Sequence, residues 1–266
     1  MSWNSKHGLN AFERRDAIKD MIAQRSEVDV HTLAKLLQTS EVTIRRDLAL
    51  LEGEGVLRRV RGGALVAESG GSGQSFILKR KLNAEQKRRI GRTAAGLIRP
   101  GERLILDSGT TVLEVARQLI SDTGHGQDVI TVITNSLPVV QLLGHRQGFE
   151  VIVIGGQFLS KYEAVAGPQA THFLQDFKVD KFIMAADGLS LEHGATADHP
   201  LEAELMRAMA ACAREIVLVA DSSKIGHVGF VTVLPLGRIH CLVTDTGAPE
   251  EFVREAQALG MRVLLA

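Results

Sequence analysis

The chain has 266 residues, with 31 acidic and 31 basic side chains, a length that fits one large or two ordinary domains. It has no run of about 18 apolar residues and no apolar signal-peptide core, which excludes membrane-spanning and secreted classes and leads us to expect a cytoplasmic protein. Cys212 and Cys241 lack metal-type spacing and are expected to be small core residues. The net charge is +2 over residues 1–67, +6 over 68–99 and −8 over 100–266, so the cations gather in the first third.

The first predicted elements are three short helices. Apolar spacing predicts a supporting helix over residues 11–24, with Phe12 on its inner face, and a second helix over residues 30–37. After a tight connection, Ser40 is a natural N-cap for a third helix that would bury Ile44. Two short helices joined by three or four residues are typical of a helix-turn-helix, whose second helix enters the DNA major groove.

A basic hairpin is predicted directly after these helices, with a turn at Gly62 and Gly63. A helix-turn-helix followed by a basic hairpin is a winged helix, and its arginines can reach DNA phosphates and base edges. The alternative for the adjacent pair Arg45 and Arg46 is a solvated charged face. Asp47 either orients a neighbouring arginine or is a helix-surface charge. The residues expected to contact DNA are Ser40, Thr43, Arg45, Arg46, Arg58, Arg59 and Arg61.

The middle of the chain predicts a change of domain. Residues 68–75 are rich in Gly and Ser and have no periodicity, which is typical of a flexible linker. In the next helix, Asn83 and Gln86 resemble a capping box. We therefore expect a winged helix-turn-helix domain at residues 1–67, a linker at 68–76 and a second domain at 77–266.

The second domain alternates short apolar strands with amphipathic helices, which predicts an open, mostly parallel α/β sheet covered on both faces. The dinucleotide-binding and P-loop glycine motifs are absent. Polar residues close several strands, and open parallel sheets bind ligands beyond the carboxyl ends of their strands.

Each polar strand end suits a different part of a ligand. The segment at 108–111 opens a helix and so suits a phosphate, as does Lys224, whereas Asp107 and Asp187 suit sugar hydroxyls. The alternative is that these residues are ordinary N-caps and turns. The residues expected to bind a small effector are Asp107, Ser108, Gly109, Thr110, Thr111, Asn135, Gly155, Gly156, Asp187, Gly188 and Lys224.

The segments Thr43–Leu48, Arg61–Ala64, Asp107–Thr111 and Asp221–Lys224 resemble those of the DeoR-type repressors, bacterial regulators of sugar catabolism. This resemblance implies a second domain similar in fold to ribose-5-phosphate isomerase, a double-stranded DNA operator, a phosphorylated sugar effector and no cofactor. One departure is that residues 202–206 read EAELM, where the family commonly has a lysine at the end of this segment. The resemblance therefore leaves the identity of the sugar open.

Three functions compete. The first is a transcriptional repressor that a phosphorylated sugar releases from its operator, and it is the one we favour. The second is a sugar-phosphate isomerase that uses Asp187, Glu202 and Lys224, but such an enzyme has no use for a winged helix. The third is a DNA-organising protein with a scaffold domain, which leaves the polar strand ends unexplained. We further expect a homo-oligomer, dimer or tetramer, because paired half-sites multiply specificity. We expect neither a metal site nor contact with a membrane.

Overall fold

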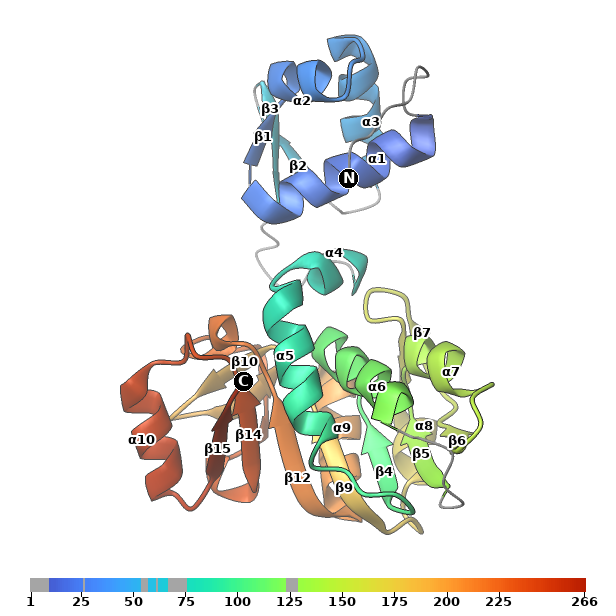
Figure 1. Ribbon diagram of the computed structural model, residues 1–266, viewed down its shortest axis with the longest axis vertical. Coiled ribbons are helices and arrows are strands. Elements are labelled where there is room, and N and C mark those ends of the chain that lie inside the picture. Colours follow the sequence, from blue (N-terminus) through green and yellow to red (C-terminus); the bar gives the residue numbers. More distant parts are fainter. Residues whose placement is uncertain (1–9, 26, 54–56, 61, 67–75, 123–128) are drawn as a thin grey trace. The chain divides into compact units, whose positions relative to one another are not determined.

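The computed structural model describes residues 10–25, 27–53, 57–60, 62–66, 76–122 and 129–266. The chain divides into two compact units, Met1–Leu82 and Asn83–Ala266, whose elements are labelled in Figure 1. Apart from Phe76, the predicted linker at 68–76 lies outside the described residues, so the predicted domain limits stay predictions. Within the first unit, helix α4 (Phe76–Lys81) buries Leu78 in the core that the preceding helices share.

The first unit is a winged helix-turn-helix, as predicted. Its described elements before α4 are α1 (Ala11–Arg25), β1 (Glu27–Asp29), α2 (Val30–Leu36), α3 (Glu41–Gly53), β2 (Leu57–Val60) and β3 (Gly63–Val66). The hairpin of β2 and β3 gains β1 as a third strand, in the order β1-β3-β2. The prediction for Phe12 is wrong: its side chain is 76% exposed, while Ile18 and Ile22 carry the buried face of α1.

Local signals explain these elements. The Ser40 hydroxyl accepts a hydrogen bond from the Thr43 amide at 3.1 Å, so the predicted N-cap of α3 is confirmed. The two glycines of the hairpin are required for different reasons. Gly62 has a φ of +94°, which favours glycine, whereas a Cβ on Gly63 would collide with the carbonyl oxygen of Val28 in β1.

The second unit contains, in its described residues, a seven-stranded parallel sheet in the order β15-β14-β12-β9-β4-β5-β6. Its elements are α5 (Ala84–Ala95), β4 (Arg103–Leu106), α6 (Thr110–Asp122), β5 (Ile130–Thr134), α7 (Leu137–Leu143), β6 (Phe149–Val153), β7 (Gln157–Leu159), β8 (Ala164–Ala166), α8 (Pro168–Phe173), β9 (Val179–Met184), β10 (Gly188–Ser190), β11 (Gly194–Ala197), α9 (Pro200–Cys212), β12 (Ala213–Val219), the 3-10 turn η1 (Ser222–Lys224), β13 (Val231–Leu234), the 3-10 turn η2 (Leu236–Arg238), β14 (Cys241–Thr244), α10 (Glu250–Ala258) and β15 (Arg262–Leu265).

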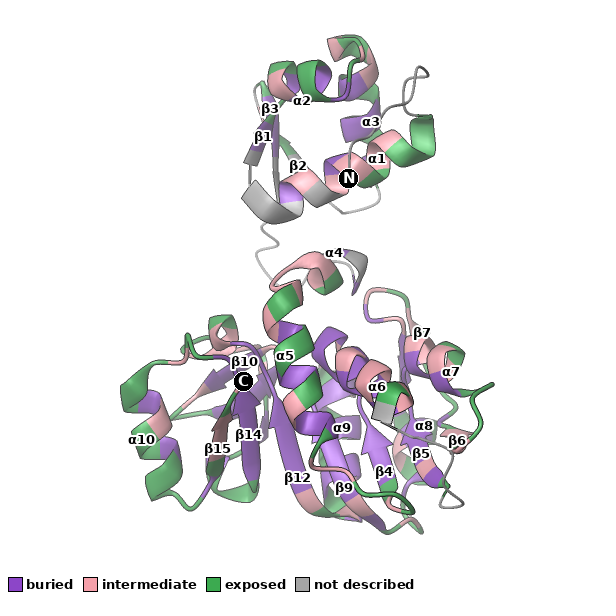
Figure 2. Cartoon of the chain, viewed as in Figure 1, coloured by how far each residue is buried: buried purple, intermediate pink, exposed green. Residues whose placement is uncertain are grey.

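Helices cover both faces of this sheet, with α5 and α6 in front and α9 behind in Figure 1. The central strands are therefore buried, as Figure 2 shows, and they are rich in Val, Ile and Leu. Cys212 and Cys241 are buried free thiols, as predicted. Two small antiparallel groups flank the main sheet, the hairpin β7–β8 and the three strands β10-β11-β13. Across the described residues, no helix combines the length and apolarity needed to cross a membrane.

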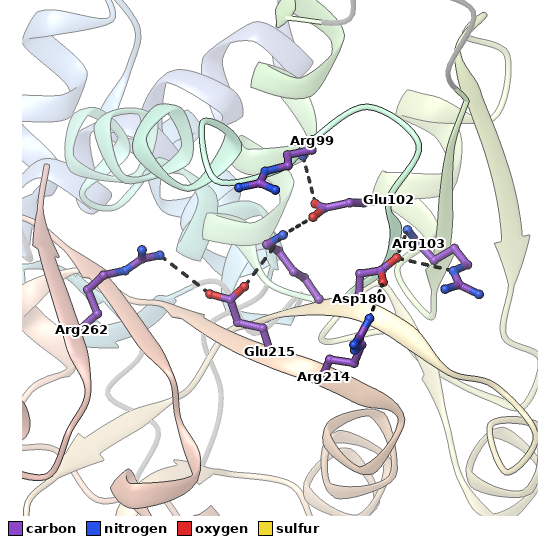
Figure 3. Close-up of polar contacts among 8 residues, drawn as sticks. Arg99, Glu102, Arg103, Asp180, Arg214, Glu215 and Arg262 are labelled. Carbon is purple, nitrogen blue, oxygen red and sulfur yellow. Dashed lines mark hydrogen bonds and ion pairs between the residues drawn. The ribbon is translucent and has the colours of Figure 1, made fainter.

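Ion pairs tie together the amino ends of the strands (Figure 3). Lys181 in β9 is only 8% exposed and contacts the carboxylates of Glu102 and, at 3.8 Å, Glu215. The other pairs are Arg262 with Glu215, and Arg103 and Arg214 with Asp180. Because these residues lie at the starts of β4, β9, β12 and β15, the network leaves the carboxyl ends of the strands for other roles.

Candidate functional site

The outward face of α3 is the first candidate site. Ile44 and Leu48 are buried, whereas Val42, Arg45 and Arg46 are exposed. Arg45 is engaged within its own helix, since its guanidinium lies 2.8 Å from the Glu41 carboxylate. Arg46 makes no side-chain hydrogen bond or ion pair in the described part of the chain. The predicted contacts Ser40 and Thr43 have hydroxyls 2.8 Å apart, so they already bind each other.

The wing carries the remaining predicted DNA contacts. Arg59 in β2 is exposed, and its backbone amide donates a hydrogen bond to Glu52 at 2.8 Å, which joins the strand to α3. The backbone of Arg58 pairs with Leu65 across the hairpin, but the side chain of Arg58 and the whole of Arg61 lie outside the described residues. Arg59 therefore places one wing cation on the surface of the unit.

A buried ion pair fixes α3 against α1. The Arg14 Nε donates to the Asp47 carboxylate at 2.6 Å, and Asp47 is 4% exposed. The alternative that Asp47 is a helix-surface charge is therefore wrong, and its arginine partner comes from another helix, 33 residues away. No local spacing could have revealed this partner.

The second candidate site lies at the carboxyl ends of the parallel strands. From β4 the chain winds one way through β5 and β6, and the other way through β9, β12, β14 and β15. The point of reversal between β4 and β9 is where open α/β sheets bind ligands. Asp107 occupies it, accepting hydrogen bonds from the amides of Ser108 at 2.7 Å and Ala185 at 3.2 Å. A Cβ on Gly109 would come within 2.6 Å of the Ala185 Cβ, so a glycine permits this close approach.

Burial changes the proton affinity of Asp107. Burial raises the pKa of its carboxyl group most, the nearby charge of Asp187 adds to the rise, and the two amide hydrogen bonds oppose both, which leaves the pKa at about 6. Asp187 is half-buried, and its carboxylate accepts a hydrogen bond from the Asp198 amide at 3.0 Å. The point of reversal is therefore a polar site that solvent reaches poorly.

Two buried residues outside the predicted effector set complete this cluster, Glu202, which was expected only in the isomerase alternative, and Tyr162, which was not expected. Glu202 in the first turn of α9 is 7% exposed, and the Ser108 hydroxyl donates a long hydrogen bond to it at 3.5 Å. Tyr162, in the connection between β7 and β8, is 8% exposed. Burial raises the pKa of Tyr162 most, and the charges of Glu202, Asp187 and Asp198 and a hydrogen bond with Glu202 raise it further.

The same tyrosine contacts a cation of its own hairpin connection and a histidine ring. The Lys161 Nζ lies 3.0 Å from the Tyr162 hydroxyl, and the His199 ring meets the tyrosine ring edge-on at 6.1 Å between centroids. A single tyrosine belongs to no sequence motif, so the only available signal was its position shortly after the Gly155–Gly156 strand end. The hairpin thus contributes the site's Tyr162 and Lys161.

Other predicted effector residues follow β4, β5 and β6 and differ in how far they are buried. Thr110 and Thr111 are buried in the first turn of α6. The Asn135 amide nitrogen donates to the Val165 carbonyl at 3.1 Å, and the Asn135 Oδ1 is buried without a hydrogen-bond partner among the residues that the structure describes. Gly155 and Gly156 are exposed after β6.

Gly188 and Lys224 belong to two segments that lie beside each other. Gly188 opens β10, and the segment that follows Lys224 pairs with that strand through the Gly226 amide and the Leu189 carbonyl at 2.8 Å. Among the described residues, no hydrogen bond or ion pair joins the Lys224 side chain to Asp107 or the start of α6. The structure therefore brings Asp107, Ser108 and Asp187 together more closely than it brings Lys224 to them.

The polar residues that follow β12 and β14 are engaged in hydrogen bonds between segments of the fold. Asp221 accepts a hydrogen bond from the Asn83 amide group at 2.9 Å, and Asp245 accepts from the Ser222 amide and hydroxyl. Burial alone would raise the pKa of Asp245, but the hydrogen bonds from Ser222 and Gly247 outweigh it and lower the pKa. The predicted capping box is wrong, because Asn83 has a φ of +51° and makes no side-chain cap.

Comparisons with known proteins identify both domains. Residues 14–70 match the family described as "DeoR-like helix-turn-helix domain", and residues 82–246 match "DeoR C terminal sensor domain". The chain is 35% identical to a candidate aga operon transcriptional repressor of Escherichia coli O157:H7, over 98% of this chain and 96% of that protein. It is 34% identical to the HTH-type transcriptional repressor GlcR of Bacillus subtilis, over 95% of each. A ribose 5-phosphate isomerase A from Methanocaldococcus jannaschii matches 54% of this chain and 55% of that chain, with 17% identity and a TM-score of 0.40, which is too low to support an inference.

Proposed function

Because the chain belongs to the DeoR family of helix-turn-helix transcriptional regulators, we propose that it represses a carbohydrate-utilisation operon and leaves its operator when a phosphorylated sugar binds. The observation that carries the effector half of this proposal is the buried polar cluster of Asp107, Glu202 and Tyr162 at the point of strand reversal. Buried carboxyl groups are costly unless a partner or a ligand compensates them, and DNA binding by the first unit does not require them.

On the DNA side, we assign base reading to Arg46 and phosphate contact mainly to the other arginines. Arg46 is exposed on the outward face of α3 and has no partner in the described residues, so it is free to make a bidentate contact with a guanine edge. Arg45 would have to leave Glu41 to do the same, and Arg59 lies on the wing. Arg58 and Arg61, whose side chains are not described, keep their predicted phosphate role.

On the effector side, the carboxylates suit the sugar hydroxyls and the start of α6 suits the phosphate. Asp107, Asp187 and Glu202 accept hydrogen bonds, and the unpartnered Asn135 Oδ1 is a further acceptor that a ligand hydroxyl would satisfy. The amide groups at the start of the 13-residue helix α6 carry the positive end of its dipole, which favours an anion. Lys224 is retained as a proposed phosphate contact, one that would have to reach the start of α6 from the 3-10 turn η1.

The isomerase alternative has one supporting observation, the raised pKa of the Asp107 carboxyl group, which suits a general acid or base near neutral pH. We nevertheless propose that the protein is not an enzyme, because the relatives named above are repressors. Nuclear magnetic resonance of aldose and ketose phosphates incubated with the protein tests this directly. We expect no interconversion above that of a heat-inactivated sample.

We propose that the protein acts as a homo-oligomer on paired half-sites. A single recognition helix reads few base pairs, and two copies one helical turn apart, about 34 Å, multiply the specificity. Sedimentation of the protein alone and with its duplex measures the number of copies bound. A monomer that retains full affinity for a symmetric duplex would contradict the proposal.

The decisive experiment joins both sites in one assay. A thermal-shift screen over sugar phosphates should find one that stabilises the protein by about 2.7 kcal/mol at 100 times its Kd. The same compound should release the full-length protein from DNA upstream of the genes it controls, measured by gel shift. Arg46→Ala should lose DNA affinity but keep the thermal shift, whereas Lys224→Ala should keep DNA binding and resist release. Wild-type DNA affinity of Arg46→Ala would refute the DNA-site assignment, and release of Lys224→Ala at the wild-type effector concentration would refute the effector-site assignment.

A further inference from the structure

Val42 is a large apolar residue in an unexpected place. It is the second residue of α3, and its side chain is 73% exposed. At about 100° per residue, Val42 and Arg46 lie roughly opposite the buried Ile44, one turn apart on the outermost stripe of the helix. Nothing within the described unit covers this valine, and a β-branched residue is a weaker helix former than alanine, so the fold itself gains nothing evident from it.

The neighbouring side chains of the same two turns are already engaged. The hydroxyls of Ser40 and Thr43 bind each other, and Ser40 also caps the helix. The Glu41 carboxylate lies between Arg45, at 2.8 Å, and the His31 ring nitrogen, at 3.3 Å. Val42 and Arg46 therefore form the part of this face that is left for a partner.

The partner's chemistry follows from the DNA-binding role, and the inference rests on the proposed function. The amino-terminal residues of a recognition helix meet base edges in the major groove, where the 5-methyl group of thymine is the apolar feature. Four residues of helix rise about 6 Å, which is close to two base-pair steps of about 3.4 Å. We infer that Val42 packs on a thymine methyl group within about two base pairs of the guanine that Arg46 reads.

Replacing thymine by deoxyuracil tests this, because it removes the methyl group and leaves the hydrogen-bonding edge unchanged. A preferred duplex is first selected from a randomised pool with the full-length protein, and each thymine is then replaced singly. For the wild type, we expect one position in each half-site to weaken binding about fourfold, the effect of one buried methyl group. Because Val42→Ala changes both half-sites at once, it should weaken binding to the thymine duplex by about the square of that factor, roughly fifteenfold, and be insensitive to uracil at that position.

A matched control uses Leu50, another exposed apolar residue of α3, two turns further along the helix and 48% exposed. Leu50→Ala should respond to every uracil substitution as the wild type does. The inference is overturned if no uracil position weakens the wild type, or if Val42→Ala loses the same factor as the wild type at each position. If the full-length protein selects no sequence from the pool, the proposed function fails and the inference fails with it. If it selects a sequence but shows no coupling to Val42, only the inference fails.

Discussion

Removing the Asp47 carboxylate should loosen the recognition helix within an otherwise intact chain. Arg14 is held in a largely buried position, with 13% of its side chain exposed, and its Nε lies 2.6 Å from the Asp47 oxygen. Asp47→Ala leaves that guanidinium buried without this carboxylate, which typically costs about 3–5 kcal/mol. Because small domains are stable by only about 5–15 kcal/mol, the loss is a large fraction of the stability of the first unit.

Two variants separate charge from packing. Asp47→Asn keeps a hydrogen-bond acceptor, and we expect it to cost about 1 kcal/mol, the difference between charged and neutral hydrogen bonds. The double variant Arg14→Met, Asp47→Leu replaces both partners with apolar groups, and such replacements of buried pairs are often neutral or stabilising. It should therefore be more stable than Asp47→Ala alone, although it removes more polar groups.

Backbone amide hydrogen exchange on the full chain measures these effects, since peptides from α1 and α3 report the opening of the first unit separately from the second. Asp47→Ala should accelerate exchange in both helices and weaken operator binding. Peptides from the parallel sheet serve as the internal control. Unchanged exchange in α3, or a double variant as unstable as the single one, would refute the reasoning that removing this carboxylate from a buried guanidinium drives the loss.

Three further predictions follow from the same contacts. Because folding raises the pKa of Asp107 from 3.8 to about 6, the folded protein keeps a proton that the unfolded chain releases, and this group's contribution to stability falls by about 3 kcal/mol as the pH rises through that window. Urea denaturation at pH 4.5 and pH 7 should show a smaller loss of unfolding free energy for Asp107→Asn than for the wild type, and an equal loss in both proteins would contradict this. Tyr162→Phe keeps the ring but removes the hydroxyl beside Glu202 and Lys161, and we expect about fivefold weaker effector binding by calorimetry with DNA affinity unchanged. Wild-type effector affinity of this variant would show that the hydroxyl does not contact the effector. Gly63→Ala should lower the stability of the first unit by about 1–3 kcal/mol, because the added Cβ collides with β1. Hydrogen exchange in residues 27–66 should become faster, and wild-type exchange there would show that β1 can shift at little cost.

The sequence determined the features that depend on neighbours along the chain. The spacing of Ile44 and Leu48 sets the buried stripe of α3, and Ser40 caps the same helix, so both could be read from local periodicity. Polar residues at strand ends predicted the edge of the sheet to which we assign the proposed effector site. Where the local signal was short or ambiguous, prediction failed. The three residues of β1 have no usable period, and Phe12 fits a helical face but lies one turn before the point where α1 meets the core.

The tertiary structure decided which distant side chains meet. Ser108 and Glu202 are 94 residues apart, and they approach only because β4 lies beside β9 and α9 returns over the same edge. Asn83 has the spacing of a capping residue, yet its amide group binds Asp221, 138 residues away, and its own backbone takes a left-handed conformation instead. The local cap would use the Asn83 side-chain oxygen as acceptor, whereas the distant bond uses its amide nitrogen as donor. The two need different placements of one side chain, and the free energy of the whole packed unit determines which is made.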